Sequence, residues 1–322
     1  DRSVSRGLGD VYKRQILVEL VKLANLIINI NKSIACGNRI QSIFEMQPSI
    51  TDGSGQKVDK VRTDTADRSE EAEYAVEFSH VGLTYAGAGD ESLTDIDFKV
   101  KKGETIGIIG GTGSGKSSVV NLIPRFYDVT SGFIKVDGKD VKDYPLEELR
   151  GKIGTVLQKA VLFHGTIREN LKWGNPDATE EDLNRAITVA QAKEFVDNKE
   201  GRLDFEIEQG GKNLSGGQRQ RLTIARAVVK KPEILILDDS ASALDFATDA
   251  ALRKAIREME GETTVFIVSQ RAASIQHADR IVVLDDGKIV GLGTSEELLE
   301  SCEVYQEIYN SQFKKQEGGK TA

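Results

Sequence analysis

GGTGSGKS, at residues Gly110–Ser117, is the most informative segment of this 322-residue chain. It fits the pattern G-x-x-x-x-G-K-[ST], in which glycines allow backbone N–H groups to close around phosphate oxygens. An apolar run at Ile106–Ile109 precedes it, and a helix-compatible stretch at Lys116–Ile123 follows it. The chain has 31 glycines, so an ordinary glycine-rich coil is the alternative. Because strand, complete motif and helix coincide, the sequence predicts a phosphate-binding loop at the start of a helix.

Individual side chains of this loop carry separate expectations. Lys116 is expected to contact the β- and γ-phosphates of a nucleotide, and Ser117 is expected to ligate Mg²⁺. The positive end of the helix dipole adds to the attraction for phosphate. The predicted nucleotide contacts of the loop are Gly110, Thr112, Gly113, Ser114, Gly115, Lys116, Ser117 and Ser118.

Composition and charge narrow the class of protein. A hydrophobic content of 39% suits a packed core, whereas a net charge of −8 and a pI near 5.2 argue against a nucleic-acid-binding surface. Only Cys36 and Cys302 occur, so no disulfide framework is implied and a reducing cytosolic environment fits. No stretch of 18 uncharged apolar residues occurs, so length alone predicts no complete membrane span.

The N-terminal part divides into segments of different character. Asp1–Gln15 resembles translated sequencing-adapter sequence and is left out of the fold prediction, which implies that the natural protein begins further upstream. In Ile16–Ile34 the charged residues and asparagines fall within an arc of roughly 140° on a helix, and apolar residues cover the rest. This pattern fits either a soluble amphipathic helix or the end of a membrane-bundle helix whose polar side faces the interior. The helix is predicted to continue through Arg39–Met46 and to end at Pro48.

A change in composition marks the main domain. Residues Ser49–Glu73 are rich in Ser, Thr, Asp, Gly and Lys, which predicts a linker over residues 48–73. From Tyr74 the pattern changes to short alternating strands, and a compact α/β domain is predicted for residues 74–313, followed by a disordered tail at 314–322. The expected strands before the phosphate loop are Ala75–Phe78, Val81–Tyr85, Asp95–Val100 and Thr105–Ile109.

Further elements follow from apolar runs, caps and turns. Thr179, with two glutamates after it, is expected to cap the first helix of a helical insertion at residues 180–198. Ser215 is expected to begin a helix that runs to Val229. Asp285-Asp286-Gly287 indicates a hairpin turn between two strands. Strands are expected at Phe133–Val136, Ile153–Leu157, Ile234–Leu237 and Thr264–Val268, and the last two are continuous apolar runs typical of a parallel sheet covered on both faces.

Two carboxylates end the apolar run ILILDD at Ile234–Asp239. A carboxylate at a strand end beside a phosphate loop is where Mg²⁺-bound water needs an acceptor, and Asp238 is assigned this role. Gln158 follows another strand and is expected to touch the metal or its water from a second side, and it is predicted to act in catalysis. Tyr85 is a candidate for stacking on an adenine ring, with a strand core residue as the alternative.

The motifs follow one another in a familiar order. GGTGSGKS, Gln158, LSGGQ, ILILDD, Ser242-Ala243-Leu244-Asp245 and Ser269-Gln270-Arg271 together resemble the ATP-binding domain of exporter-type ABC transporters, over roughly Ala75–Phe313. The resemblance implies an α/β fold: a P-loop NTPase core with a mostly parallel sheet and flanking helices, an antiparallel β subdomain and a helical subdomain. It also implies that residues 16–47 are the end of the last transmembrane helix with its cytosolic extension.

In this family two such domains form a head-to-tail sandwich, and each ATP lies between one subunit's phosphate loop and the other subunit's LSGGQ. The implied cofactors are ATP and Mg²⁺, and the implied location is the cytoplasmic face of a bacterial plasma membrane. Ser215 would cap a helix whose N-terminus points N–H groups at a γ-phosphate across the interface, although S-G-G before a helix is also ordinary cap chemistry. Asp245 matches the loop that communicates between the two sites and is equally a good helix N-cap. The nucleotide contacts implied for this half of the sandwich are Leu214, Ser215, Gly216, Gly217, Gln218 and Asp245.

Two residues depart from the family pattern. Asp239 stands where the family usually has Glu, and its carboxylate falls back by roughly 1–1.5 Å because Asp is one methylene shorter. Gln270 stands where the family usually has His, and Gln can carry neither a proton nor a positive charge to the γ-phosphate. Both changes affect hydrolysis and leave the binding residues intact. The pattern resembles the degenerate-site half of a heterodimeric exporter of the multidrug or lipid type, and a slow homodimer is the alternative.

Three other functions are alternatives to an exporter half. A soluble ABC ATPase of DNA repair, chromosome maintenance or cluster assembly is disfavoured by the apolar helix and the acidic charge balance. An importer's detached ATPase would begin its strands near the N-terminus, and a nucleotide-binding regulatory subunit overlaps with the degenerate-site hypothesis. His80, His164 and His277 lack metal-like spacing, and His277 is interpreted as a surface residue, so no metal beyond nucleotide-bound Mg²⁺ is expected.

Overall fold

The computed structural model describes residues 2–53, 73–240, 243–259 and 262–317, and side chains from residue 11 to residue 313 within these ranges. The chain separates into two compact units, with the boundary after Thr51. Most of the predicted linker, residues 54–72, lies outside the described residues. So do Ser242, from the motif before Asp245, and residues 318–322 of the predicted tail.

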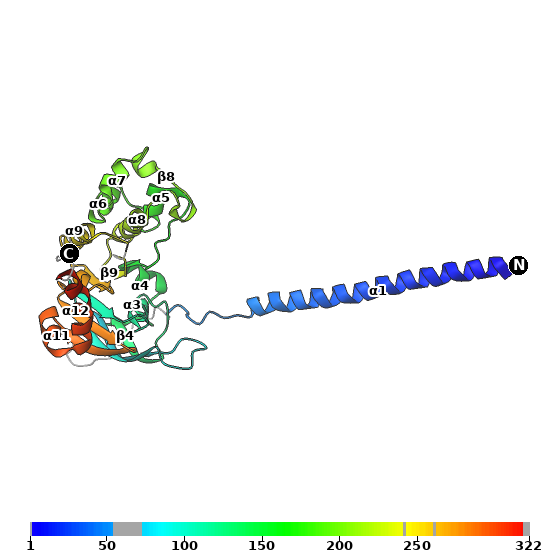
Figure 1. Ribbon diagram of the computed structural model, residues 1–322, viewed down its shortest axis with the longest axis horizontal. Helices are drawn as coiled ribbons and strands as arrows, with labels where there is room; N and C mark the ends of the chain where they lie inside the picture. Colours follow the sequence, from blue (N-terminus) through cyan, green and yellow to red (C-terminus); the bar gives the residue numbers. More distant parts are fainter. Residues whose placement is uncertain (1, 54–72, 241–242, 260–261, 318–322) are drawn as a thin grey trace. The chain divides into compact units, whose positions relative to one another are not determined.

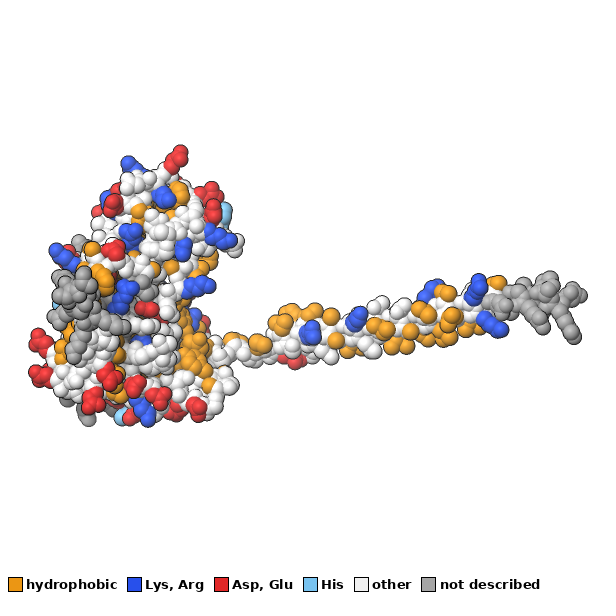
Figure 2. Space-filling model, in the orientation of Figure 1, with side chains coloured by type: hydrophobic (Ala, Val, Ile, Leu, Met, Phe, Trp, Pro, Cys, Tyr) orange, Lys and Arg blue, Asp and Glu red, His pale blue; other side chains and the backbone are white. Residues whose placement is uncertain are grey.

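The first unit consists mainly of one continuous helix, α1 (Arg2–Phe44) (Figure 1). The helix begins inside the segment that resembles adapter sequence and ends just before the predicted stop at Pro48. Figure 2 shows hydrophobic side chains along much of its surface, with Lys and Arg side chains between them. Among the parts of the chain that the structure describes, no helix combines the length and the apolar character needed to cross a bilayer.

The second unit is built on a six-stranded sheet. Five neighbouring strands are parallel, and the edge strand β12 pairs with β11 in the antiparallel sense. This arrangement confirms the predicted mostly parallel sheet. In spatial order the strands are β12 (Lys288–Gly293), β11 (Arg280–Asp285), β3 (Thr105–Gly110), β10 (Thr264–Val268), β9 (Ile234–Asp238) and β6 (Ile153–Val156).

Alternation along each central strand divides the core into two layers, because successive side chains of a strand point to opposite faces. In β9, Ile234 and Ile236 pack into a cluster with the N-terminal strands, whereas Leu235 and Leu237 pack into a second cluster with the helices. All five residues of β9 are buried. The continuous apolar run predicted this two-sided burial correctly.

A second, four-stranded sheet forms the antiparallel part of the unit. Residues 75–85 were expected to form two strands, but Tyr74–Leu83 is a single strand with a register shift between Phe78 and Val81, where His80 has a φ of 47°. A bulge interrupts strand alternation without ending the strand, which explains the error. In spatial order the strands are β2 (Leu93–Lys101), β1 (Tyr74–Leu83), β4 (Ser131–Val136) and β5 (Lys139–Asp140).

A helical part lies beside the sheets, at one end of the second unit (Figure 1). This part also contains a small antiparallel ladder of β7 (Gly165–Thr166) and β8 (Glu206–Ile207). Thr179 caps α6 through a capping box with Asp182, as its sequence position predicted. The helices are α5 (Ile167–Lys172), α6 (Glu180–Val189) and α7 (Lys193–Asp197), with single 3₁₀ turns at Arg202–Asp204 and Gln209–Gly211.

The remaining helices surround the six-stranded sheet. α12 continues to Glu317, so the predicted disordered tail does not begin at residue 314. The sequence interpretation also missed the short helices α4, α5, α10 and α11, which are too short to show a helical period. The helices outside the helical part are α3 (Lys116–Leu122), α4 (Leu146–Lys152), α8 (Gly216–Val228), α9 (Phe246–Arg257), α10 (Ala272–Ile275), α11 (Ser295–Ser301) and α12 (Glu303–Glu317).

Candidate functional site: a phosphate-loop cleft

A cleft of about 480 Å³ lies at the carboxyl ends of the parallel strands. The strands β3, β10, β9 and β6 are neighbours, so the loops that follow them meet at one edge of the sheet. Ligands of α/β sheets bind at this edge. The lining residues are Tyr85, Glu91, Ser92, Thr112, Gly113, Gly115, Lys116, Ser117, Ser118, Gln158, Asp238, Asp239, Val268, Ser269, Gln270, Asp286 and Gly287.

Close packing excludes any side chain at two positions of the phosphate loop, Gly110 and Gly115. A Cβ at Gly110 would lie 2.1 Å from the Leu284 carbonyl oxygen, because β3 passes close to β11 there. Gly115 has a φ of 92°, and a Cβ would lie 2.6 Å from the Leu93 side chain. Gly115 is also the N-cap of α3, so the left-handed residue turns the chain directly into the helix. Glycine is therefore required at these two positions by the local packing, independently of any ligand that the loop binds.

Lys116 is buried, and its ammonium group is folded back into the loop. Nζ donates to the carbonyl oxygens of Gly110, at 2.9 Å, and Gly111, and lies 3.3 Å from Ser114 Oγ. Burial lowers the pKa of the Lys116 ammonium, against the attraction of the two nearby carboxylates. The group is thus a cation held at the rim of the cleft by neutral carbonyl oxygens.

Two of the three residues predicted to serve one metal ion, Ser117 and Asp238, are in direct contact. Ser117 Oγ donates to Asp238 Oδ1 at 3.0 Å. Burial raises the pKa of the Asp238 carboxyl, and the hydrogen bond from Ser117 opposes that shift. The hydroxyl from the start of α3 and the carboxylate from the end of β9 thus form one oxygen-rich corner of the cleft.

Asp239 lies next to this corner with a left-handed backbone, at a φ of 43°. Its N–H donates to the Val268 carbonyl at 2.9 Å, which ties the ends of β9 and β10 together. Gln158 Nε2 donates to Asp239 Oδ2 at 3.4 Å, and burial raises the pKa of the Asp239 carboxyl. Gln270 follows β10 and has an exposed side chain that lines the same cleft. The structure therefore brings together the three residues predicted for hydrolysis.

Tyr85 lies two residues beyond the end of β1 and packs against the core cluster of the N-terminal strands, so its core contact, the alternative interpretation, is present together with its place at the cleft. Its hydroxyl donates to Ser118 Oγ at 2.8 Å, and its ring packs edge-on against Tyr127 at 4.9 Å between centroids. The ring is half-buried and lines the cleft. A fixed aromatic face at the mouth of a cleft is suited to stacking on a base.

Several lining residues were missed from the sequence. Asp286 and Gly287 form the turn of the β11–β12 hairpin, and the Gly287 carbonyl accepts a hydrogen bond from Thr94 N at 2.9 Å. That turn reaches the cleft only because β11 pairs with β3, a neighbour remote in sequence. The others are Glu91, Ser92 and Val268, which carry no local motif, and Ser269, which begins the Ser269-Gln270-Arg271 motif but had no predicted site role.

The LSGGQ segment lies at the start of α8 and none of its residues lines the cleft. Ser215 caps α8: its Oγ accepts from Gln218 N at 3.2 Å, and Gln218 Oε1 accepts from Ser215 N at 3.1 Å. Arg219 holds the preceding turn through the Leu214 carbonyl at 2.6 Å. Ser215 and Gly216 are exposed, so the capped helix start faces outward. The LSGGQ segment is therefore not part of the cleft that contains the phosphate loop.

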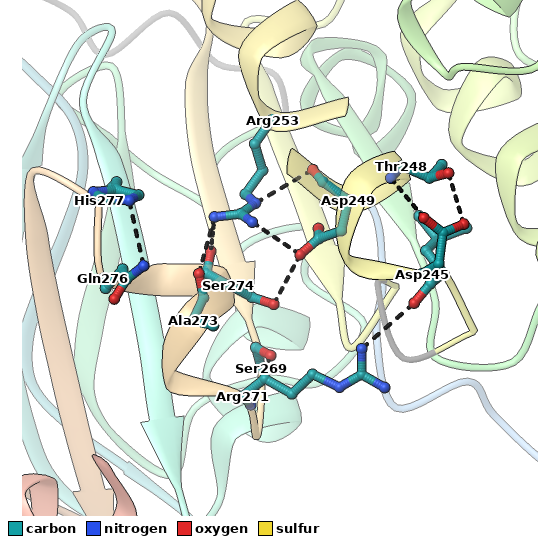
Figure 3. A network of polar contacts seen from close by, with 11 residues as sticks. Asp245, Thr248, Asp249, Arg253, Ser269, Arg271, Ala273, Ser274, Gln276 and His277 are labelled. Carbon is teal, nitrogen blue, oxygen red and sulfur yellow. Dashed lines mark hydrogen bonds and ion pairs between the residues drawn. The ribbon is translucent and has the colours of Figure 1, made fainter. Parts of the chain in front are cut away.

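A polar network supports the segment between the cleft and α9 (Figure 3). Asp245 caps α9 through the N–H of Thr248 at 2.9 Å, and hydrogen bonds from Thr248 lower the pKa of its carboxyl. The buried Asp249 accepts from Arg253 and from Ser274 Oγ, each at 3.1 Å. These contacts fix α9 against α10, which follows Gln270 in the chain.

The corner formed by Ser117 and Asp238 suits Mg²⁺ held jointly with a nucleotide. Mg²⁺ is commonly bound by one or two protein oxygens plus phosphates and water, without a full protein cage. The described residues contain no group of three or more His, Cys, Asp or Glu that could hold a metal ion. His80, His164 and His277 are exposed, in agreement with the surface assignment of His277.

Comparison with known proteins identifies the domain. The family described as ABC transporter matches residues 93–242, which include the phosphate loop, LSGGQ and both carboxylates of the cleft. The chain carries an ABC transporter domain. Its second unit has the ATP-binding-domain fold expected of that family.

Relatives and a solved structure extend the similarity beyond this domain. The chain is 38% identical over 292 residues to a Bacillus subtilis protein provisionally named multidrug export ATP-binding/permease protein YgaD, covering 90% of the chain and 48% of that protein. It is 39% identical over 316 residues to the B. subtilis ABC transporter ATP-binding protein YfiB, covering 97% and 53%. A structure of a bacterial Atm1-family ABC exporter with ATP bound matches with a TM-score of 0.78 at 29% identity, covering 88% and 48%. The chain thus spans about half the length of these proteins.

Proposed function

We propose that the cleft binds ATP with Mg²⁺. The observation that carries this proposal is the Ser117–Asp238 hydrogen bond beside Lys116, because it joins a phosphate loop to a metal-binding carboxylate. Tyr85 would stack on the adenine, Lys116 would contact the β- and γ-phosphates, and Ser117 and Asp238 would hold the metal. The N–H groups of the loop would surround the phosphates.

The chain would act as half of an ABC exporter that uses ATP to drive efflux. Its relatives include a protein with a multidrug-export name, and the matching structure is an exporter with ATP bound. In this proposal α1 contains the end of the last transmembrane helix, and the second unit lies on the cytoplasmic face of a bacterial plasma membrane. Membrane fractionation of the full-length gene product tests this part, since recovery in the soluble fraction would favour a soluble ABC ATPase.

The two glycine-rich loops would serve different nucleotides. The phosphate loop would hold ATP in this chain's own cleft. With Asp239 and Gln270 in place of Glu and His, hydrolysis there would be slow. The exposed, capped LSGGQ would complete the cleft of a partner half that supplies Glu and His. In support of this proposal, the N-cap of LSGGQ is well formed, and none of its residues lines this chain's own cleft.

The deciding experiment measures ATP binding and turnover of the purified chain alone and with a second exporter half that has Glu and His. Binding by the chain alone with slow turnover, and fast turnover only in the mixture, is the expected result. Lys116→Ala provides the control for binding. Fast turnover by the chain alone would contradict the heterodimer and favour a homodimer, whereas failure to bind nucleotide would overturn the proposed function.

A further inference from the structure

One side chain of the C-terminal helix contacts the segment that carries Gln270. Gln312 Nε2 donates to the Gln270 carbonyl at 2.7 Å, and Gln312 Oε1 accepts from the Ala272 N–H at 2.9 Å. Both polar ends of the amide are thus used on backbone atoms that flank Arg271. A primary amide fits this pair of contacts because it offers a donor and an acceptor side by side.

The helix that presents Gln312 is firmly seated on the core. Tyr305 is fully buried, and its hydroxyl is 2.8 Å from Ser295 Oγ. Tyr309 and Phe313 continue the same face at a spacing of four residues, with ring centroids 4.2 Å apart. Gln312 is seven residues after Tyr305, two helical turns on, so it lies on this inward side. The amide is therefore presented by a rigid element.

Gln312 supplies a cap that α10 lacks in its own sequence. Arg271 is the N-cap residue of α10, and its side chain makes no capping hydrogen bond. The first N–H of the helix, at Ala272, has no partner inside the helix and is instead satisfied by Gln312 Oε1. Removing the amide would leave this N–H and the Gln270 carbonyl to find other partners, and the segment would lose its fixed position.

The segment that Gln312 contacts, residues 270–272, presents two side chains in different directions. Gln270 lines the nucleotide cleft. Arg271 extends toward the residues that lead into α9 (Figure 3), with Nη1 3.5 Å from the Leu244 carbonyl and its guanidinium carbon 5.5 Å from the centroid of the Phe246 ring. The backbone N–H of Arg271 also donates to Ser269 Oγ at 3.0 Å. The backbone from 269 to 272 thus connects the cleft to the segment before Asp245.

We propose that Gln312 is a positioning residue for the nucleotide site. It holds the backbone on both sides of Arg271, so that Gln270 faces the cleft and Arg271 reaches the Leu244–Asp245 segment. The inference rests on the proposed ATP-binding function. A displacement of about 1 Å at a reacting group can reduce a rate on the order of 10²-fold, so loss of this support affects turnover more than binding.

The test compares two variants and a matched control in the full chain. Gln312→Met keeps the length and the apolar stem of the side chain and removes both hydrogen bonds. Gln312→Glu keeps an acceptor for Ala272 N–H but replaces the donor to the Gln270 carbonyl with an ionised oxygen. Gln306→Met is the control, because it makes the same substitution at a half-buried position of the same helix. Among the described residues, the Gln306 side chain has no hydrogen-bond partner.

Three quantities are measured: affinity for a fluorescent ATP analogue, single-turnover hydrolysis with protein in excess, and amide exchange of residues 269–275. Both Gln312 variants should bind within about 3-fold of wild type and hydrolyse ATP about 10-fold more slowly. Exchange at Ala272 should be faster in Gln312→Met, which lacks the acceptor for this N–H, while residues 305–311 of α12 keep their protection. Gln306→Met should match wild type in all three.

Each other result decides against a specific claim. Faster exchange with unchanged turnover would mean that Gln312 only fastens α12 to the core, and the positioning role would be wrong. Unchanged exchange at Ala272 in Gln312→Met would overturn the proposed contact itself. Loss of protection throughout α12 in Gln312→Met, with Gln312→Glu folded and fully active, would also overturn it. Absence of analogue binding or of any turnover by wild type would instead overturn the proposed function, and the inference with it.

Discussion

The Ser117 hydroxyl donates a hydrogen bond to the Asp238 carboxylate at 3.0 Å across 121 residues of sequence. This contact places an oxygen pair at the point where the phosphate loop meets the end of β9. Ser117→Ala and Asp238→Asn should therefore each weaken Mg²⁺-dependent ATP binding by at least about 10-fold, since a hydrogen bond or ligand to a charged group contributes about 1.5–3 kcal/mol. Titration of a fluorescent ATP analogue with and without Mg²⁺ measures this effect.

The same titration carries its own control. Ser301→Ala, on α11, removes only a hydroxyl bonded to the Glu297 carbonyl and should bind like wild type. Without Mg²⁺, the Ser117 and Asp238 variants should approach wild type. An equal loss of affinity in the presence and absence of Mg²⁺ would assign the two residues to nucleotide binding without a metal.

Restoring the family residues at the two departing positions should raise turnover. Asp239→Glu extends the carboxylate further into the cleft, and Gln270→His supplies a group that can carry a proton. The double variant should hydrolyse ATP on the order of 10–100 times faster than wild type, with little change in affinity. Steady-state phosphate release measures the change. Asp239→Asn in the same assay should give no gain, and a double variant as slow as wild type would locate the limitation outside these two residues.

The LSGGQ segment should influence another subunit's cleft more than its own. Ser215→Ala removes the N-cap of α8, which costs about 0.5–2 kcal/mol of stability, and exposes a helix start without its hydroxyl. ATP turnover of a mixture with a competent partner should fall at least about 10-fold, while ATP affinity of this chain alone stays close to wild type. If Ser215→Ala lowers the chain's own affinity to the same extent, the two loops act on one nucleotide.

The cleft carboxylates should destabilise the nucleotide-free protein at neutral pH. Burial raises the pKa of Asp239 above its unfolded-state value, so the folded state binds the proton more tightly and stability falls as pH rises through that interval. Asp239→Asn should therefore raise the Tm at pH 7–8, by about 2–4 °C for each kcal/mol relieved in a domain of this size. The difference in Tm between Asp239→Asn and wild type should shrink as the pH falls, because the wild-type carboxyl then becomes neutral. Thermal unfolding across this pH range tests the sign, and a larger advantage at acidic pH would contradict it.

The network between α9 and α10 should be a major source of local stability. Asp249 is buried, and the Arg253 side chain is only 15% exposed. Asp249→Leu would leave a cation without its partner and should cost about 3–5 kcal/mol in urea unfolding. Asp249→Asn keeps an acceptor and should cost less. Asp249→Leu with Arg253→Leu should recover part of the loss, and full additivity of the two single changes would show that the pair does not interact.

Local sequence predicted those parts of the cleft that consist of a motif next to a strand. The phosphate loop, the caps at Thr179 and Ser215 and the carboxylates after β9 all depend on neighbours within a few residues, and the structure contains them where expected. The bulge at His80 was missed because the apolar alternation changes phase without a glycine to mark it.

Contacts that depend on strand order could not be predicted in the same way. The hairpin turn at Asp286 was expected, but its place at the cleft follows from the pairing of β11 with β3. Gln312 offers even less local signal, since a glutamine near the end of a chain is usually a surface residue. Only the packing of α12 against the sheet brings it to the backbone at Ala272.

The position of β3 in the sheet has a consequence for synthesis. β3 carries the phosphate loop, yet both of its neighbours, β10 and β11, come far later in the chain. At about 5–20 residues per second, roughly 9–35 s pass between emergence of the loop and completion of β11. During that time the strand has two unpaired edges and an apolar surface on both faces, which is a hazard for aggregation. A ribosome-bound chain should therefore bind nucleotide only after β11 has emerged.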